Sequence, residues 1–289
     1  MTVAFIGIGT MGWPMAANVK KAGHDLIVYD SVPGRAAKFA AEHGCRAAAS
    51  LAELGDAAFV VTMLPTGKDV RGVYLDAGLA AALKSGAIAI DMTSADPTAT
   101  RELGAELARR GIVLVDAPVS GALPRATTGT LAIMIGGDDR SAVDRAKPLL
   151  AAMGDRLFDT GGLGTGHAMK ALNNFVAAAG YAAAAEALLA GKRFGLDPTR
   201  MLEILNVSTG RNFNTEVVLQ EHVVRERYAS GFQLGLLAKD VKIAADLTRD
   251  VKLDAPLARL IDQRYQQARD ALGYTSDNTE AIKAWDKDG

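Results

Sequence analysis

The chain has 289 residues, of which 49% are hydrophobic and 22% are charged, and this balance excludes a wholly disordered chain. Its 32 basic and 33 acidic residues leave a formal net charge of −1, which gives no support for electrostatic binding to nucleic acid or to an anionic membrane. No apolar window has the length of a membrane-spanning helix. A single cysteine, Cys45, excludes an internal disulfide, and no leader precedes the first predicted strand, so we expect a cytoplasmic protein.

The first half of the chain alternates short apolar runs, most of them rich in β-branched residues, with amphipathic stretches. Predicted strands cover residues 3–7, 26–30, 59–64, 88–91, 113–116 and 131–135, and predicted helices cover residues 11–22, 35–42, 97–110 and 141–153. Alternation of strands and helices implies right-handed crossovers. The first half therefore predicts a doubly wound, mostly parallel sheet.

The second half has helical periodicity only. Predicted helices cover residues 167–194, 198–206, 216–225, 234–248 and 256–272, and no strand is expected there. A glycine cluster at positions 161, 162, 164 and 166 marks the border. We predict an α/β domain at 1–162 and an all-helical domain for substrate and oligomer contacts at 163–289, beginning with a long interdomain helix. The alanine-rich stretch 177–190 favours close helix packing, between domains or between subunits.

A glycine motif joins the first predicted strand to the first helix. Residues 7–12 (GIGTMG) fit G-x-G-x-x-G, and Asp30 ends the second strand 18 positions after Gly12. In a dinucleotide-binding Rossmann domain, Gly7 permits the tight turn, Gly9 lets the backbone approach the pyrophosphate, and Gly12 allows close packing. An acid at position 30 binds the ribose hydroxyls and repels a 2′-phosphate, so NAD is the preferred cofactor. NADP stays possible, because Arg35 lies five residues further on.

Four motifs in order resemble the β-hydroxyacid dehydrogenases, the family of 3-hydroxyisobutyrate dehydrogenase and tartronate semialdehyde reductase. They are residues 5–18 (FIGIGTMGWPMAAN), 116–122 (DAPVSGA), 164–174 (GTGHAMKALNN) and the pair Lys239-Asp240. The resemblance spans nearly the whole chain. It departs from the family at position 122, where Ala stands in place of a usual second Gly. If that position has positive φ or lies against substrate, the added methyl group causes strain.

The resemblance implies a role for each matching position. Lys170 resembles the catalytic lysine and Asn174 its partner, and both would also contact substrate. The substrate loop would consist of Ser120, Gly121 and Ala122. The cofactor would contact the fingerprint residues Gly7, Gly9, Thr10, Met11 and Gly12, Asp30, the covering loop Met63, Leu64 and Pro65, the nicotinamide-side Ser94, and Lys239 of the helical domain.

The chemistry of hydride transfer also points to Lys170. Oxidation of an alcohol by NAD requires a base, and a neutral lysine serves if burial or a nearby positive charge lowers its pKa. Asn174 lies four residues away on the same helix face and orients groups without adding charge. The four histidines have no metal-ligand spacing, and His167 is assigned a packing or solvent role, so no metal is predicted. Residues 211 and 212 lie in a polar insertion that either caps a helix or faces substrate.

The sequence thus predicts an NAD(P)-dependent enzyme that interconverts a small 3-hydroxy acid and its semialdehyde. Two alternatives stay open: an imine reductase-like enzyme, which usually lacks a lysine at the position of Lys170, and a non-catalytic nucleotide sensor on the same fold. Glyoxylate and the semialdehydes of succinate, tartronate and methylmalonate, with sulphonated analogues, all remain candidate substrates. We expect a small carboxylate-bearing substrate and a homodimer or homotetramer.

Overall fold

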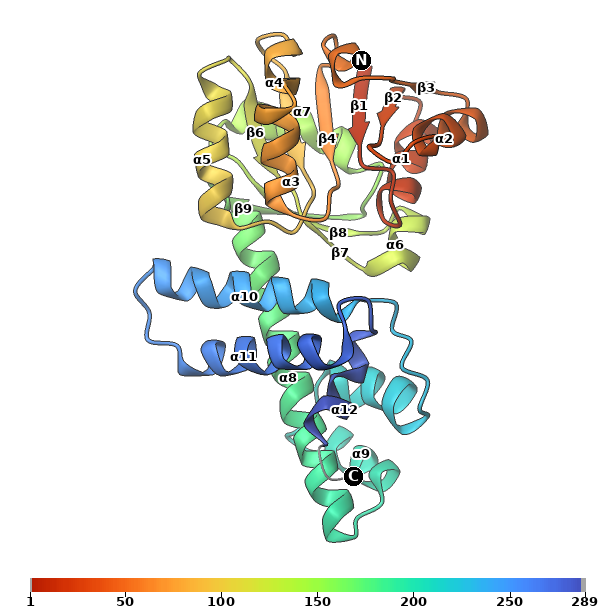
Figure 1. Ribbon diagram of the computed structural model, residues 1–289, viewed down its shortest axis with the longest axis vertical. Coiled ribbons are helices and arrows are strands. Elements are labelled where there is room, and N and C mark those ends of the chain that lie inside the picture. The colour runs from red at the N-terminus through yellow and green to blue at the C-terminus, as the bar shows by residue number, and fades with distance from the viewer. Residues whose placement is uncertain (1, 287–289) are drawn as a thin grey trace. The chain divides into compact units, whose positions relative to one another are not determined.

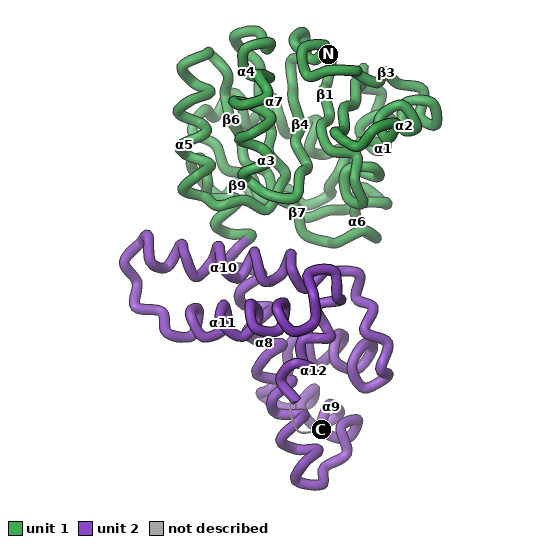
Figure 2. The backbone as a smooth tube through the Cα atoms, in the orientation of Figure 1, with its two compact units in different colours: residues 1–170 green, residues 171–289 purple. Residues whose placement is uncertain are grey.

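A computed structural model describes residues 2–286 of the chain. The chain divides into two compact units, residues 1–170 and residues 171–289 (Figure 2). Unit 1 contains a sheet with helices, and unit 2 is helical (Figure 1). The fold class predicted from the sequence is therefore confirmed: an α/β domain of the Rossmann type precedes an all-helical domain.

One nine-stranded sheet forms the centre of unit 1, with the strand order β3-β2-β1-β4-β5-β6-β8-β7 and β9 paired to β8. The strands from β3 to β6 pair in parallel, and β8 runs antiparallel to β6 and β7. The strand bounds are β1 Thr2–Ile6, β2 Asp25–Tyr29, β3 Arg46–Ala47, β4 Phe59–Thr62, β5 Ile88–Asp91, β6 Val113–Asp116, β7 Val119–Ser120, β8 Ala132–Gly136 and β9 Arg156–Gly161.

Helices cover both faces of this sheet, because successive side chains of each strand point to opposite faces. In β1, Val3 and Phe5 belong to one apolar core, whereas Ala4 and Ile6 belong to the other. The helices of unit 1 are α1 Gly12–Lys21, α2 Arg35–His43, α3 Gly67–Arg71, α4 Leu79–Ala82, α5 Pro97–Ala108, α6 Ala122–Thr128 and α7 Arg140–Leu150, with the short turns η1 Leu51–Leu54 and η2 Gly72–Asp76.

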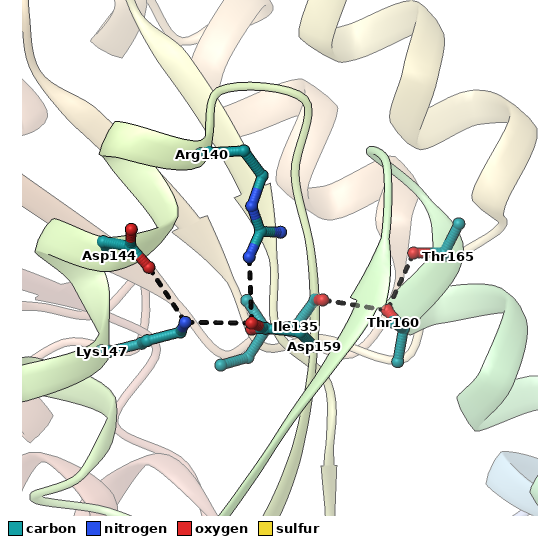
Figure 3. A network of polar contacts seen from close by, with 7 residues as sticks. All are labelled: Ile135, Arg140, Asp144, Lys147, Asp159, Thr160 and Thr165. Carbon is teal, nitrogen blue, oxygen red and sulfur yellow. Dashed lines mark hydrogen bonds and ion pairs between the residues drawn. The ribbon is translucent and has the colours of Figure 1, made fainter.

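Strand β9 was not among the predicted elements. Its side chains are mostly exposed and include charges, so no apolar run marks it in the sequence. It pairs in parallel with β8, and its Asp159 accepts from Arg140 at 2.9 Å and from Lys147 at 3.0 Å (Figure 3). These ion pairs lower the pKa of Asp159, with the hydrogen bond from Lys147 as the largest cause. Pairing to a neighbouring strand, which no local pattern encodes, defines this element.

Unit 2 is built from helices that pack around buried Tyr181 and Tyr265. Between residues 195 and 286, the part of this unit beyond the first helix that the structure describes, the β pairing is limited to an isolated bridge from Gln233 to Asp277. The predicted long helix is confirmed as α8, Thr165–Phe194, which begins in unit 1. The other elements are α9 Pro198–Asn206, the π-helix η3 Asn214–Val224, α10 Leu234–Asp250, α11 Pro256–Leu272, η4 Asn278–Glu280 and α12 Ala281–Trp285.

Among the described residues, α8 is one helix with the length and hydropathy of a membrane span. Its most apolar 18-residue window has a mean hydropathy of 1.2, and 44% of that window is buried within the protein. The central helix of a globular domain meets the same two criteria.

Candidate functional site

Two glycines of the loop between β1 and α1 occupy positions that have no room for a Cβ atom. Gly7 has a φ of +95°, and a Cβ there would lie 2.3 Å from the Met63 carbonyl oxygen. A Cβ on Gly12 would lie 1.8 Å from the Gly7 carbonyl oxygen, whereas a Cβ on Gly9 would meet nothing within 4 Å. The backbone at Gly9 is thus open to a ligand. No side chain caps the N-terminus of α1, so the loop fits the pyrophosphate of a dinucleotide.

Asp30, directly after β2, faces this loop. Its carboxylate accepts from the Ile8 N–H at 2.7 Å and from the Val32 N–H at 2.8 Å. The Arg35 guanidinium lies 3.2 Å from both carboxylate oxygens. The predicted ribose acceptor is therefore held rigidly beside the glycine loop, and the charge of Arg35 is already matched by a carboxylate.

Two surface cavities adjoin Asp30. One of about 530 Å³ is lined by Gly9, Thr10, Trp13, Arg35 and Lys38, among others. The second, of about 420 Å³, contains Asp30 itself and extends from β2 to residues 47–49. Both lie where the nucleoside half of the cofactor is expected, so the residues present fit a dinucleotide.

The loops after β4 and β5 lie together at the same edge of the sheet. The Met63 N–H donates to the Ile6 carbonyl at 2.9 Å, and the Leu64 N–H donates to Thr93 Oγ1 at 3.1 Å. Pro65 and Ser94 follow directly in the two loops. The structure thus brings the predicted covering loop beside the glycine loop, and the loop that contains Ser94 beside the covering loop, as expected for adjacent parallel strands.

The predicted substrate loop begins in β7 and ends in α6. Ser120 pairs with Ala132 of β8, Gly121 has a φ of +134°, and Ala122 has a φ of +52°. Position 122 therefore lies in the left-handed region that favours glycine, which is the strain anticipated from the sequence. An L-residue other than glycine costs roughly 1–2 kcal/mol there.

Replacing Ala122 with Gly should raise the free energy of unfolding by up to about 1 kcal/mol, because relief of left-handed strain exceeds the added flexibility of glycine. Urea unfolding measures this change. Ala105→Gly is the matched control: Ala105 is exposed inside α5, and we expect a loss of about 1 kcal/mol. Destabilisation by both substitutions would contradict the assignment of strain.

Helix α8 starts against the sheet and carries Lys170 in its second turn. Asp116, at the end of β6, accepts from the Gly164 N–H at 2.7 Å and from the His167 N–H at 2.8 Å. On another side, Thr165 Oγ1 lies 2.8 Å from Thr160 Oγ1, which donates to the Ile135 carbonyl (Figure 3). Lys170 is thus placed by a helix whose first turn is tied to three strands.

Unit 2 contributes a second group of predicted site residues. Asn174 is buried and donates from Nδ2 to Asp240 Oδ2 at 2.6 Å. Lys239 Nζ lies 2.9 Å from the other Asp240 oxygen. Asp240 therefore joins two predicted site residues, a role that the sequence analysis did not give it. The only signal was its place in the pair Lys239-Asp240.

Two further residues have structural contacts. Asn212 Oδ1 accepts from the Asn214 N–H at 2.9 Å, just before η3. His167 is buried, and its ring contacts Thr100 rather than solvent. Among residues 2–286, no group of three or more metal-ligating side chains gathers at one place.

Comparisons with known proteins cover both units. A family model described as the NAD binding domain of 6-phosphogluconate dehydrogenase matches residues 2–162. A second model, described as NAD-binding of NADP-dependent 3-hydroxyisobutyrate dehydrogenase, matches residues 164–285. The two matches together span nearly all of the chain.

Curated relatives and a solved structure agree with these matches. Human mitochondrial 3-hydroxyisobutyrate dehydrogenase is 36% identical, with 97% of this chain and 85% of the human protein covered. The NAD-dependent L-serine dehydrogenase of Pseudomonas aeruginosa is 35% identical, with 91% of each chain covered. The structure of Mycobacterium tuberculosis 3-hydroxyisobutyrate dehydrogenase with L-serine has a TM-score of 0.88 and 33% identity, with 98% of each chain covered.

Proposed function

The chain belongs to the 3-hydroxyisobutyrate dehydrogenase family of NAD(P)-dependent 3-hydroxyacid dehydrogenases, and we propose that it oxidises a small 3-hydroxy acid to its semialdehyde with Lys170 as general acid/base. The observation that carries the proposal is the anchoring of α8. Asp116 ties the first turn of this helix to the carboxyl edge of the cofactor-binding sheet, and Lys170 follows one turn later. In doubly wound sheets, ligands bind at that edge.

Each residue has one task in this mechanism. A nicotinamide held by the glycine loop and Asp30 would supply the acceptor for the hydride that leaves the carbon bearing the hydroxyl group. Lys170 accepts the hydroxyl proton as the carbonyl forms, and returns it in the reverse direction. Ser120 and the neighbouring backbone N–H groups hold the substrate carboxylate. Asn174, whose amide is oriented by Asp240, positions the hydroxyl group without adding charge.

A substrate panel tests this function. One relative is an L-serine dehydrogenase, and the M. tuberculosis structure is of a 3-hydroxyisobutyrate dehydrogenase with L-serine. Because L-serine is itself a 3-hydroxy acid, L-serine and 3-hydroxyisobutyrate lead the panel, followed by the semialdehydes and glyoxylate in the reducing direction. Nicotinamide absorbance reports turnover. We expect activity that requires both a carboxylate and a 3-hydroxyl group. Binding of cofactor without turnover of any compound would favour a sensor instead.

We also propose NAD as the preferred cofactor. A 2′-phosphate would approach the Asp30 carboxylate, and Arg35 is already paired with that carboxylate. The double variant Asp30→Asn with Ser31→Arg should shift the ratio of kcat/KM values toward NADP by roughly 100-fold, since it removes one negative charge and adds a positive one. Asp25→Asn, an exposed change at the first residue of β2, should leave the ratio unchanged. Higher efficiency of the unmodified enzyme with NADP would contradict the proposal.

A homo-oligomer completes the proposal. Leu172 and Val176 lie one turn apart on α8, and 37% and 67% of their surfaces are exposed. An apolar helix face of this kind is suited to a second copy of the chain. Light scattering after size-exclusion chromatography should give a mass of at least two chains, and Val176→Glu should lower it. A monomer at micromolar concentration would contradict this.

A further inference from the structure

His167 lies in the first turn of α8, three residues before Lys170, and is 1% exposed. Its ring faces two elements of unit 1. Nδ1 lies 2.8 Å from Thr100 Oγ1 on α5, and Nε2 lies 3.7 Å from Asp91 Oδ2 at the end of β5. A buried imidazole ring between these two groups does more than fill space, because each ring nitrogen must donate or accept according to the neighbour that it faces.

The neighbour on α5 determines which nitrogen carries a proton. Thr100 Oγ1 donates to the Asp96 carbonyl oxygen at 2.8 Å, and a carbonyl oxygen only accepts. The one proton of the Thr100 hydroxyl is therefore donated to Asp96. Toward His167 the Thr100 oxygen can only accept, so His167 Nδ1 is the donor and is protonated. Nε2, which has no hydrogen-bond partner among the described residues, therefore points at Asp91.

Asp91 faces the ring from β5 and is itself fully enclosed. Burial raises the pKa of its carboxyl, and the nearby His167 lowers it. His167 Nε2 and Asp91 Oδ2 face each other at 3.7 Å, and both side chains are enclosed by the protein. Attraction between imidazole and carboxyl then holds α8 against β5.

Asp91 continues the connection to the cofactor loops. Its Oδ1 accepts from Thr62 Oγ1 at 2.9 Å and from the Thr93 N–H at 3.0 Å. Thr93 Oγ1 in turn accepts from the Leu64 N–H at 3.1 Å. A continuous series of buried and partly buried contacts thus runs from the loop after β4, through the loop after β5, to His167 on α8.

We propose that His167 is a positioning residue that holds the first turn of α8, and with it Lys170, in register with the two loops that follow β4 and β5. The proposal rests on the proposed function of Lys170. The other anchors of this turn are Asp116, at the end of β6, and Thr160, which joins the turn to the β8–β9 pair (Figure 3). The His167 side chain alone among these anchors faces Asp91, which organises the cofactor loops.

Three variants test the proposal with 3-hydroxyisobutyrate and NAD. His167→Leu keeps the apolar bulk and should lower kcat by 10- to 100-fold, since a shift of about 1 Å at a reacting group costs up to about 100-fold, while KM for NAD changes less than threefold. His167→Gln keeps an N–H donor and should retain at least a third of kcat. Thr100→Val removes the acceptor of the His167 Nδ1–H group. It should also lower kcat, but by a smaller factor than His167→Leu does.

A second readout is independent of turnover. Amide hydrogen exchange of residues 164–170, measured without cofactor, should quicken at least tenfold in His167→Leu and less than threefold in His167→Gln, because the helix start opens locally. His222→Leu, a change in η3 of unit 2, is the control and should leave this segment unchanged. Should His167→Leu not fold, Thr100→Val and His167→Gln give both readouts.

A double variant separates this inference from the proposed function. In a Lys170→Ala background, His167→Leu should no longer lower kcat, because it acts through Lys170. An equal loss in both backgrounds would overturn positioning. Unchanged kcat in His167→Leu, with Lys170→Ala impaired, would overturn the inference and leave the proposed function intact. Full turnover in Lys170→Ala would instead refute the proposed function.

Discussion

Substitution of Lys170 by Ala should lower kcat for oxidation of a 3-hydroxy acid by about 10²–10⁴, the usual loss when a general acid/base is removed. The affinity for NAD should change little, because the glycine loop and Asp30 lie on other elements of unit 1. Stopped-flow and steady-state measurements of nicotinamide absorbance separate these two effects. Since the base must be unprotonated to accept the hydroxyl proton, we expect kcat of the unmodified enzyme to rise with pH, and the remaining rate of Lys170→Ala to lack this rise.

Three control variants distinguish proton transfer from packing. Lys170→Met keeps most of the side-chain stem and should be as impaired as the alanine variant. Lys192→Ala, an exposed change near the other end of α8, should have full activity. Asn174→Ala should lose less than Lys170→Ala, because Asn174 orients groups and transfers no proton. Near-complete turnover in Lys170→Ala would require a different proton carrier.

Substitution of Asp116 by Ala should destabilise the protein by about 2–5 kcal/mol. The Asp116 side chain is fully buried and accepts from two backbone N–H groups, those of Gly164 and His167. Each donor left unpaired in the interior costs about 1–3 kcal/mol. Urea or thermal unfolding of the two proteins gives the difference.

Two control variants separate the effect of the Asp116 hydrogen bonds from the effects of losing a charge and of losing an exposed carboxylate. Asp116→Asn keeps one acceptor oxygen and should lose less than the alanine variant. Asp144→Ala removes an exposed carboxylate that pairs with Lys147, and exposed pairs contribute at most about 1 kcal/mol. Equal stability of Asp116→Ala and Asp144→Ala would mean that other contacts hold the start of α8.

Local patterns in the sequence were enough to predict the glycine loop and the NAD(P)-binding domain that contains it. In the turn at residues 7–12, glycine is the residue type that a φ of +95° at Gly7 and a Cβ contact of 1.8 Å at Gly12 require, and Met63 of the loop after β4 also closes the space at Gly7. The long helix α8 and the absence of predicted strands after it follow from helical periodicity, which is also local. The prediction for Lys170 came from the four family motifs and their order along the chain, rather than from the spacing of Lys170 and Asn174 alone.

Contacts between distant segments were decided only by the tertiary structure. The bond from Asn174 to Asp240 and the facing of His167 and Asp91 join residues 66 and 76 positions apart. Sequence patterns report which face of an element is apolar, but they do not report which buried polar groups meet. In the interior each donor must find an acceptor, and the partner is whichever group the packed strands bring near. The sequence by itself therefore determined the fold class and the cofactor loop, whereas the packing of β5, β6 and α8 decided how Lys170 is held.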